Sequence, residues 1–277
     1  MLVTPLTPVI GAEVSAVDLT GVLKPELTDA LHQELMKHHV LFFREQNLTA
    51  QELTDFATNF GPIAGPHHTY PALPGHPSVM VLDTNSDNPP DSAEWHSDLT
   101  FQPSSAFASV LQGVIIPPVG GDTLWASLFA VHDALPPGLR RDLEDLSAVH
   151  DLGSFRNQAF AEGGSEKVDQ LMASVGSAAH PIIDHHPVTG RPFINVNETF
   201  TVHVLGMSRP ESHRLLTFLF GFINRPQFHV RLRWHPGTIA LWDNRGSQHY
   251  AVDDYLPHRR VMHRVVVSAD QRQPSKS

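Results

Sequence analysis

The sequence predicts a mostly β fold with flanking helices (α+β), in which short strands form an antiparallel double sheet. Segments of strand type are numerous and short, and few of them alternate with helices in the β–α–β order of parallel sheets. No internal repeat and no Ser/Gly-rich or Pro-rich linker divides the 277 residues, and the 23 prolines are scattered. We therefore expect one domain over residues 1–277.

Three helices are expected from leucine spacing and from N-terminal capping signals. The first carries leucines four residues apart, which lie on one helical face. The other two begin at capping boxes, in which Thr49 is followed by Glu52 and Ser208 by Glu211 three residues later. The expected helices cover residues 25–39, 49–60 and 208–222.

Strands are expected where β-branched and aromatic residues gather in short runs. The runs cover residues 40–43, 79–82, 106–115, 193–196, 228–234 and 238–242. A last strand is expected over residues 257–267. Arg260, Met262 and Arg264 alternate along it with Val261, His263 and Val265, and its end is apolar.

Alternation on this last strand directs Arg260 and Arg264 from one face into the core. A buried guanidinium is costly unless an anion neutralises it, so both arginines require anionic partners. The planar guanidinium fits a carboxylate or a sulfonate through two hydrogen bonds. A bound anion would be such a partner; the alternative is an ion pair with Asp253, Asp254 or another acidic side chain.

A candidate metal site combines His96-Ser97-Asp98 with the distant His249. On a strand, residues two apart point to the same side, so His96 and Asp98 could reach one ion while Ser97 points away. Two imidazoles and one carboxylate leave coordination positions open, as non-haem Fe(II) oxygenases require for a co-substrate and O2. The same donors also suit catalytic zinc, which would make the protein a hydrolase.

The chain resembles the taurine dioxygenase family of Fe(II)- and 2-oxoglutarate-dependent oxygenases. The resemblance spans nearly the whole chain and rests on four motifs at family spacing. They are WHSDLTF (residues 95–101), GGDTLW (120–125), WDNRGSQH (242–249), and YAVDDYLP with the basic run after it (250–264). The resemblance implies a double-stranded β-helix, or jelly roll, with helices packed outside and the metal at one mouth.

The resemblance also implies a role for each matching residue. His96, Asp98 and His249 match the iron ligands, so Fe(II) is the expected metal and O2 the expected oxidant. Thr123 and Arg260 match the residues that hold the distal carboxylate of the co-substrate 2-oxoglutarate. The implied reaction hydroxylates the carbon next to a sulfonate, as in taurine, and releases sulfite and an aldehyde while 2-oxoglutarate is decarboxylated.

The implied substrate is a small sulfonate anion. The residues that match its binding positions are His67, Tyr70, Ser92 and Arg264. Ser92 replaces an asparagine of the typical enzyme, and a hydroxyl in place of an amide would alter recognition of the amine end. Phe155 or Phe200 could line the substrate pocket.

Because Ser92 departs from the family pattern, two other substrates of the same reaction remain alternatives, an alkyl sulfate and an aryloxy carboxylate. Outside that chemistry, the alternatives are the zinc hydrolase and a jelly-roll binding protein without catalysis. The intact set of presumed ligands argues against the binding protein. Thr123 and the two inward arginines would have no explanation in the hydrolase.

Composition excludes several other classes of protein. The absence of cysteine excludes disulfides, thiolate zinc sites and cysteine-ligated iron–sulfur clusters. The formal net charge of -10 argues against nucleic-acid binding. We find no secretory signal and no apolar run of about 18 residues that could cross a bilayer, so a cytoplasmic protein is expected. The family resemblance suggests a homo-oligomer, either a dimer or a tetramer.

Overall fold

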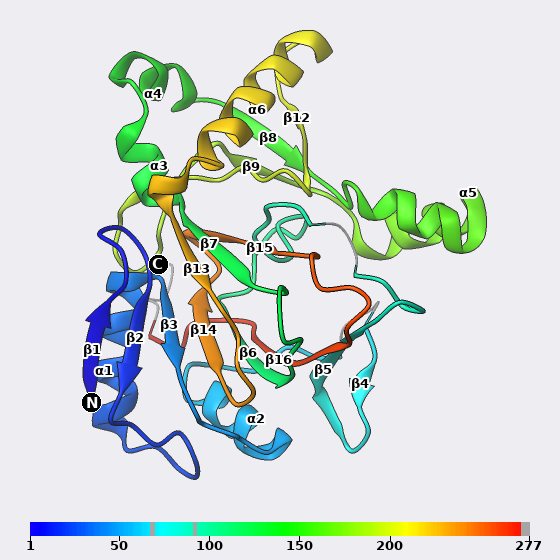
Figure 1. Cartoon of the computed structure of the whole chain (residues 1–277). Helices are drawn as coiled ribbons and strands as arrows, with labels where there is room; N and C mark the ends of the chain where they lie inside the picture. Colours follow the sequence, from blue (N-terminus) through cyan, green and yellow to red (C-terminus); the bar gives the residue numbers. More distant parts are fainter. Residues whose placement is uncertain (67–69, 91–92, 273–277) are drawn as a thin grey trace.

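The largest element of the fold is an eight-stranded sheet in the lower half of the molecule (Figure 1). The computed structural model describes residues 1–66, 70–90 and 93–272. In spatial order the strands are β1 (Leu2–Pro5), β2 (Ala12–Ser15), β3 (Val40–Phe43), β14 (Ile239–Asp243), β6 (Ala108–Ile115), β16 (Arg260–Val267), β5 (His76–Thr84) and β4 (Ala72–Leu73). Neighbouring strands are antiparallel except for the pair of β2 and β3.

A second, three-stranded antiparallel sheet packs against the large one. Its strands are β13 (His229–Leu232), β7 (Thr123–Ser127) and β15 (Ser247–Ala251). Trp125 of β7 meets Phe42 of β3 and Trp242 of β14 in the buried layer between the sheets, with ring centroids 5.2 and 5.7 Å apart. Met262 of β16 lies in the same layer. The two packed sheets confirm the predicted jelly roll.

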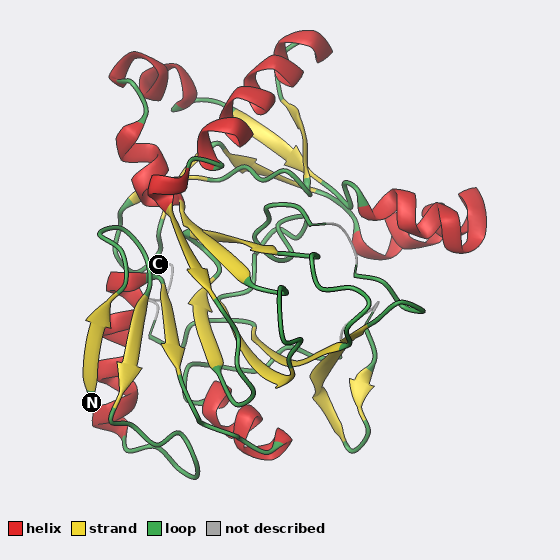
Figure 2. Cartoon of the chain, in the orientation of Figure 1, coloured by secondary structure: helices red, strands yellow, loops and turns green. Residues whose placement is uncertain are grey.

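Two helices cover the outer face of the large sheet, as the secondary-structure view also shows (Figure 2). They are α1 (Pro25–His38) and α2 (Ala50–Thr58). The leucines of α1 and Phe56 of α2 pack on Leu41 and Val265. The capping box at Thr49 is present, as predicted. Helix α1 ends one residue earlier than predicted, because His39 adopts a left-handed backbone with φ of 65°.

A further group of elements lies above the two sheets in Figure 1. It comprises α3 (Leu128–Ala134), α4 (Pro137–Leu143), β8 (Ser147–His150), β9 (Ala178–Pro181), β10 (Ile183–His185), β11 (Pro192–Ile194), β12 (Thr201–Val204), α6 (Arg209–Ile223) and the 3-10 turn η1 (Pro226–Phe228). Helix α6 begins at the predicted capping box of Ser208 and Glu211. Helix α5 (Phe155–Val175) projects to the right of the view and is interrupted at Gly163 and Gly164.

The seven strands predicted from apolar runs and from the alternation at residues 257–267 are present, with some differences at their ends. The strand over residues 40–43 matches β3, and the basic strand over residues 257–267 matches β16 except at its start. The predicted strand over residues 228–234 is shortened to β13: the turn η1 takes Phe228 at its start, and Arg233 and Trp234 lie beyond its end. Within the described ranges, no helix combines the length and the apolar character needed to span a bilayer.

Candidate functional site

His96 and His249 lie side by side because their backbones pair. His249 belongs to β15, and His96 forms an isolated bridge with it. The His96 N–H donates to the His249 carbonyl at 3.1 Å, and the His249 N–H donates to the His96 carbonyl at 2.8 Å. The two imidazole centroids are 4.1 Å apart. Two residues remote in sequence thus present adjacent rings, as the metal-site prediction requires.

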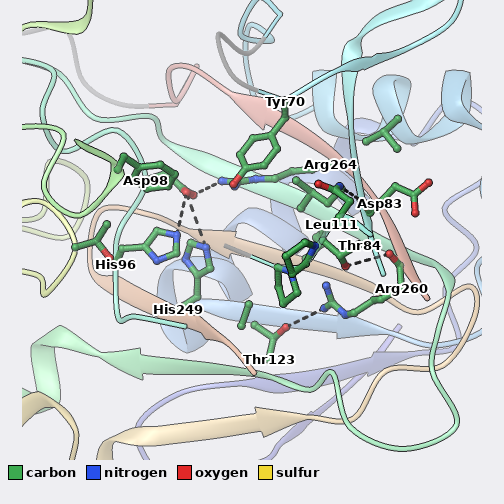
Figure 3. A pocket seen from close by; sticks show the side chains of 18 of the residues that line it. Tyr70, Asp83, Thr84, His96, Asp98, Leu111, Thr123, His249, Arg260 and Arg264 are labelled. Carbon is green, nitrogen blue, oxygen red and sulfur yellow. Dashed lines mark hydrogen bonds and ion pairs between the residues drawn. The ribbon is translucent and has the colours of Figure 1, made fainter. Parts of the chain in front are cut away.

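Asp98 completes the cluster, but not through strand geometry. It lies in a turn, and Leu99 after it has a φ of 58°. The prediction that this tripeptide is a strand is therefore wrong, because the chain turns back directly after His96. Asp98 Oδ1 nevertheless lies 3.7 Å from His96 Nε2 and 3.8 Å from His249 Nε2 (Figure 3). Ser97 points away, as predicted, and donates to a backbone carbonyl of β15 at 2.8 Å.

These three side chains fit a divalent metal ion. Their ligand atoms all lie within 4.8 Å of one another. His96 Nδ1 is 3.0 Å from the carbonyl of Glu94; because a carbonyl only accepts, Nδ1 is the donor, and Nε2 is the ring nitrogen that faces Asp98. Burial lowers the pKa of His249 well below its ordinary value, so this second ring is neutral. Two imidazoles and a carboxylate are the donor set of non-haem Fe(II) sites.

The second carboxylate oxygen of Asp98 is held by Arg264 of β16. Arg264 Nη2 donates to Asp98 Oδ2 and also to Ser109 Oγ, the latter at 2.8 Å. Burial raises the pKa of Asp98, but the charge of the bonded Arg264 acts against burial, and the pKa lies below its ordinary value of 3.8. Asp98 is therefore an anion with one oxygen facing the imidazoles and the other engaged by arginine.

A second basic position lies at the start of β16, where Arg260 meets Thr123 of β7. Arg260 Nε donates to the Gly121 carbonyl at 3.1 Å, and Arg260 Nη2 donates to Thr123 Oγ1 at 3.5 Å. Trp234 Nε1 donates to the same hydroxyl oxygen at 2.9 Å. A β-carbon at Gly121 would lie 3.1 Å from Arg260 Cδ, so the glycine leaves room for the arginine. Because Thr123 Oγ1 accepts these bonds, its own proton remains available to an anion.

Arg260 has no carboxylate partner in the part of the chain that the structure describes. Its side chain is buried, and no aspartate or glutamate of the described ranges lies within 4.0 Å of its guanidinium. Asp254, one of the predicted alternatives, instead accepts a hydrogen bond from the Gly121 N–H at 2.9 Å. Burial lowers the pKa of Arg260, although an arginine keeps its charge. A buried, charged guanidinium without a carboxylate partner indicates an anion-binding position.

A cavity of about 570 Å³ extends from the metal cluster to Arg260. This volume lies in the range of small-molecule sites. The predicted residues on its wall are Tyr70, His96, Asp98, Thr123, Phe155, Phe200, His249, Arg260 and Arg264. Two other predicted residues, His67 and Ser92, lie outside the described residues.

One side of this cavity is apolar. The Phe200 ring stacks on Phe155 with centroids 5.8 Å apart, and it meets Phe101 edge-on at 5.3 Å. Leu171 and Val175 of α5 also line the cavity, and they are not among the predicted site residues. Their spacing of four residues is a signal that could have found them, although Gly163 and Gly164 interrupt the helix before them.

Two carboxylates line the cavity, and both are already paired. Asp98 is bound by Arg264. Asp83 accepts hydrogen bonds from Arg259 Nε at 2.8 Å and from Arg259 Nη2 at 2.6 Å. Among the described lining residues, none of the carboxylates is therefore left to receive an ammonium group.

Comparisons with known proteins agree with this site. The model of the "Taurine catabolism dioxygenase TauD, TfdA family" matches residues 2–266. The chain is 34% identical over 271 residues to an alkylsulfatase of Acinetobacter baylyi, and the match covers 96% of this chain and 84% of that protein. It is also 34% identical over 274 residues to an alpha-ketoglutarate-dependent sulfate ester dioxygenase of Pseudomonas putida, with 97% and 89% covered.

The fold has a solved counterpart. The crystal structure of a taurine dioxygenase from Burkholderia xenovorans superposes with a TM-score of 0.83 at 32% sequence identity. The superposition covers 97% of this chain and 89% of that one. The similarity therefore extends over nearly the whole fold.

Proposed function

The chain belongs to the taurine catabolism dioxygenase TauD, TfdA family, and on that premise we propose that it oxidises a sulfate ester with an apolar alkyl tail. As a member of this family it is an Fe(II)-dependent dioxygenase that uses 2-oxoglutarate and O2, and is neither a zinc hydrolase nor a binding protein without catalysis. The observation that carries the substrate proposal is the cavity wall, which is apolar on one side and offers no unpaired carboxylate among its described residues.

Fe(II) is assigned to His96, Asp98 and His249. Three protein donors would leave the remaining coordination positions of the ion to 2-oxoglutarate and O2. When bound, the iron supplies the activation of O2 that lets an unreactive C–H bond be hydroxylated. The chain's part is to present two imidazoles and one ionised carboxylate in fixed positions.

Arg260 and Thr123 are assigned to the distal carboxylate of 2-oxoglutarate. This carboxylate would neutralise the buried guanidinium, and the free Thr123 proton would make a further hydrogen bond. The site is shielded from solvent, which strengthens the attraction between the two charges.

Arg264 is assigned to the sulfate group of the substrate. It lies on the same face of β16 as Arg260, and Tyr70 points toward it (Figure 3). Within the described part of the chain, Arg264 Nε is buried and makes no hydrogen bond, so the guanidinium retains a donor. His67 and Ser92 are assigned to the same end of the substrate on the family resemblance.

An alkyl tail suits the rest of the cavity better than the ammonium group of taurine does. The rings of Phe101, Phe155 and Phe200, together with Leu171 and Val175, offer dispersion contacts and removal of apolar surface from water. An ammonium group there would lose its hydration without gaining a carboxylate. Taurine is therefore the second candidate, supported by the structural similarity to a taurine dioxygenase.

The proposed reaction consumes one O2 for each ester. One oxygen atom enters the C–H bond next to the ester oxygen, and the other enters succinate as 2-oxoglutarate loses CO2. The hydroxylated ester then breaks its C–O bond and gives an aldehyde and hydrogen sulfate. Arg264 and the phenylalanines hold the substrate at its two ends, so that the carbon between them faces the cluster; Phe200 lies edge-on to His96 with centroids 6.0 Å apart.

A substrate panel tests this proposal. Fe(II)-loaded enzyme with 2-oxoglutarate and O2 would be offered hexyl sulfate, hexanesulfonate, taurine and an aryloxyacetate, and succinate, aldehyde, sulfate and sulfite would be measured. We expect the highest kcat/KM for hexyl sulfate, with sulfate and aldehyde in equal amounts. Efficient release of sulfite from taurine would replace the proposal with the small-sulfonate function. Selective turnover of the aryloxyacetate would replace it with the aryloxy carboxylate function.

The apolar wall is tested separately at α5. Leu171→Trp narrows the cavity and should shift the preference from hexyl sulfate toward a shorter ester, without slowing the succinate formation that occurs without substrate. Met172→Trp is the matched control, because Met172 is the next residue of α5 and is not part of the cavity wall. An equal change of chain-length preference in both variants would contradict the assigned tail position.

A further inference from the structure

The three metal-site side chains are supported in two different ways. His96 and His249 hold each other through a pair of backbone hydrogen bonds, at 3.1 and 2.8 Å. Asp98 lies beyond this bridge in a turn, so strand pairing does not fix its backbone. Other contacts must therefore hold Asp98 in position beside the two imidazoles.

The backbone of Asp98 is held by one side chain, that of Asn244. The Asp98 N–H donates to Asn244 Oδ1 at 2.7 Å, and Asn244 Nδ2 donates to the Asp98 carbonyl at 2.9 Å. The carboxamide thus bonds to both the N–H and the carbonyl of Asp98, as the backbone of a paired strand would. Both groups of Asp98 are buried, so without these bonds they would be left unsatisfied.

Asn244 is itself immobilised from several directions. Its side chain is 2% exposed, its Nδ2 also donates to the Ala106 carbonyl at 3.3 Å, and its N–H donates to the Phe107 carbonyl at 2.8 Å. It follows β14 directly, and the residues on either side of it, Asp243 and Arg245, are joined by an ion pair of 2.7 Å. The carboxamide therefore has a fixed position from which to hold Asp98.

The same ion pair extends to the end of the described chain. Arg245 Nη2 also lies 3.0 Å from Asp270 Oδ2, and Asp270 accepts a hydrogen bond from His32 of α1 at 3.1 Å. Asp243 in turn pairs with His186 at 3.0 Å. This buried network joins four separate segments of the chain behind Asn244 and resists its displacement.

We propose that Asn244 is the positioning residue of the carboxylate ligand, and that its carboxamide sets the metal affinity of the site by fixing the backbone of Asp98. No side chain with a single polar function can make both bonds, and glutamine carries the amide one methylene too far. The inference rests on the proposed ligand role of Asp98, and it is independent of which substrate the enzyme takes.

The test is a titration of metal-free protein with Co(II) in the absence of 2-oxoglutarate and substrate, followed by the visible absorption of the ion. Asn244→Leu should weaken Co(II) binding about 10–100-fold, the range typical of residues that orient metal ligands. Gln112→Met is the matched control: Gln112 is also buried, its carboxamide also donates to a backbone carbonyl, that of Leu48 at 2.9 Å, and it lies outside the cavity wall. The control should bind Co(II) as the wild type does.

His96→Ala separates failure of the ligand assignment from failure of this proposal. Wild-type affinity in His96→Ala would overturn the ligand set. Loss of binding in His96→Ala together with wild-type affinity in Asn244→Leu would leave the ligand set intact and overturn the positioning role. An equal loss in Asn244→Leu and Gln112→Met would reduce the effect to general destabilisation and would also overturn it.

A measurement on the wild type covers the case in which Asn244→Leu does not fold. Residue-resolved hydrogen exchange of the metal-free protein should find the Asp98 amide protected to a degree similar to that of His249, whose amide lies in the backbone bridge. Exchange of the Asp98 amide at the rate of an unprotected turn would overturn the proposal.

Discussion

Arg260 and Arg264 lie on the same face of β16, yet their surroundings differ. Arg264 has an anionic partner in the protein, because Asp98 Oδ2 accepts a hydrogen bond from its Nη2, as Ser109 Oγ also does. Arg260 is bound only by neutral groups, the carbonyl of Gly121 and the hydroxyl of Thr123, among the residues that the structure describes. Both residues are arginines on one face of the same strand, so the difference lies in the hydrogen-bond acceptors that the facing elements supply.

This difference separates a structural charge from a charge that serves a ligand. A buried ion pair is complete within the protein and holds Asp98 in its ionised state. A buried cation without an anion is a cost that binding of a ligand can offset. On the proposed function, the carboxylate of 2-oxoglutarate would neutralise Arg260, whereas Arg264 would hold both Asp98 and the substrate anion.

Breaking the pair at Arg264 should have the largest effect. Arg264→Met leaves the Asp98 carboxylate buried without its cation, and we expect the metal-free protein to lose about 3–5 kcal/mol of unfolding free energy. Addition of Co(II) should restore part of the loss, since the ion supplies a new positive charge. Urea denaturation with EDTA and with Co(II) measures both values. A loss of stability below about 1 kcal/mol without metal would contradict the account.

The stability deficit of Arg264→Met should depend on pH. In the wild type, Arg264 helps to hold the pKa of Asp98 below 3.8, so the carboxylate stays ionised down to that region. In the variant, burial acts without the arginine and raises the pKa of Asp98 above 3.8. The folded variant then binds a proton before the unfolded chain does, so it gains stability as pH falls. Denaturation series should find the deficit greatest at pH 7 and smaller at pH 4; a constant deficit would refute this reasoning.

Removing Arg260 should have the opposite pattern, with little effect on stability and a large one on co-substrate binding. Arg260→Met replaces a buried cation without a carboxylate partner by an apolar side chain, so the unfolding free energy should stay the same or rise. The affinity for 2-oxoglutarate should fall by about 2–4 kcal/mol. Calorimetric titration of Co(II)-loaded protein with 2-oxoglutarate measures the change. Wild-type affinity in this variant would place the co-substrate elsewhere.

A conservative change at Arg260 should have the smallest effect. Arg260→Lys keeps the charge but loses the planar pair of donors that faces a carboxylate. We expect about a tenfold loss of 2-oxoglutarate affinity, or about 1.4 kcal/mol. The same calorimetric titration gives the result. A loss as large as that of Arg260→Met would mean that geometry outweighs charge at this position.

Much of the fold followed from local signals in the sequence. Both capping boxes and the strand over residues 40–43 are present as predicted, because they depend on short-range hydrogen bonding and on continuous apolar runs. Strand β15 was not predicted, although it carries His249. Its first residues, Ser247 and Gln248, are polar and yet buried, so its pattern of hydrophobicity does not indicate a strand.

The site was predictable as a set of residue types but not as a set of contacts. The sequence indicated that Arg260 and Arg264 need anions, and it could not tell that, among the described residues, only Arg264 finds one. Asn244 belonged to a recognised motif, but its bonds to the backbone of Asp98 join residues far apart in the chain. Such pairings depend on the tertiary fold, and no local pattern encodes them.

The most direct test of the central claim is an anaerobic titration of Fe(II)-loaded wild-type protein with 2-oxoglutarate, followed by the visible charge-transfer band of the chelate. We expect a band that saturates at one 2-oxoglutarate for each chain. In Arg260→Met, half-saturation should require a much higher concentration of 2-oxoglutarate. Absence of the band with iron bound, or an unchanged titration in the variant, would contradict it.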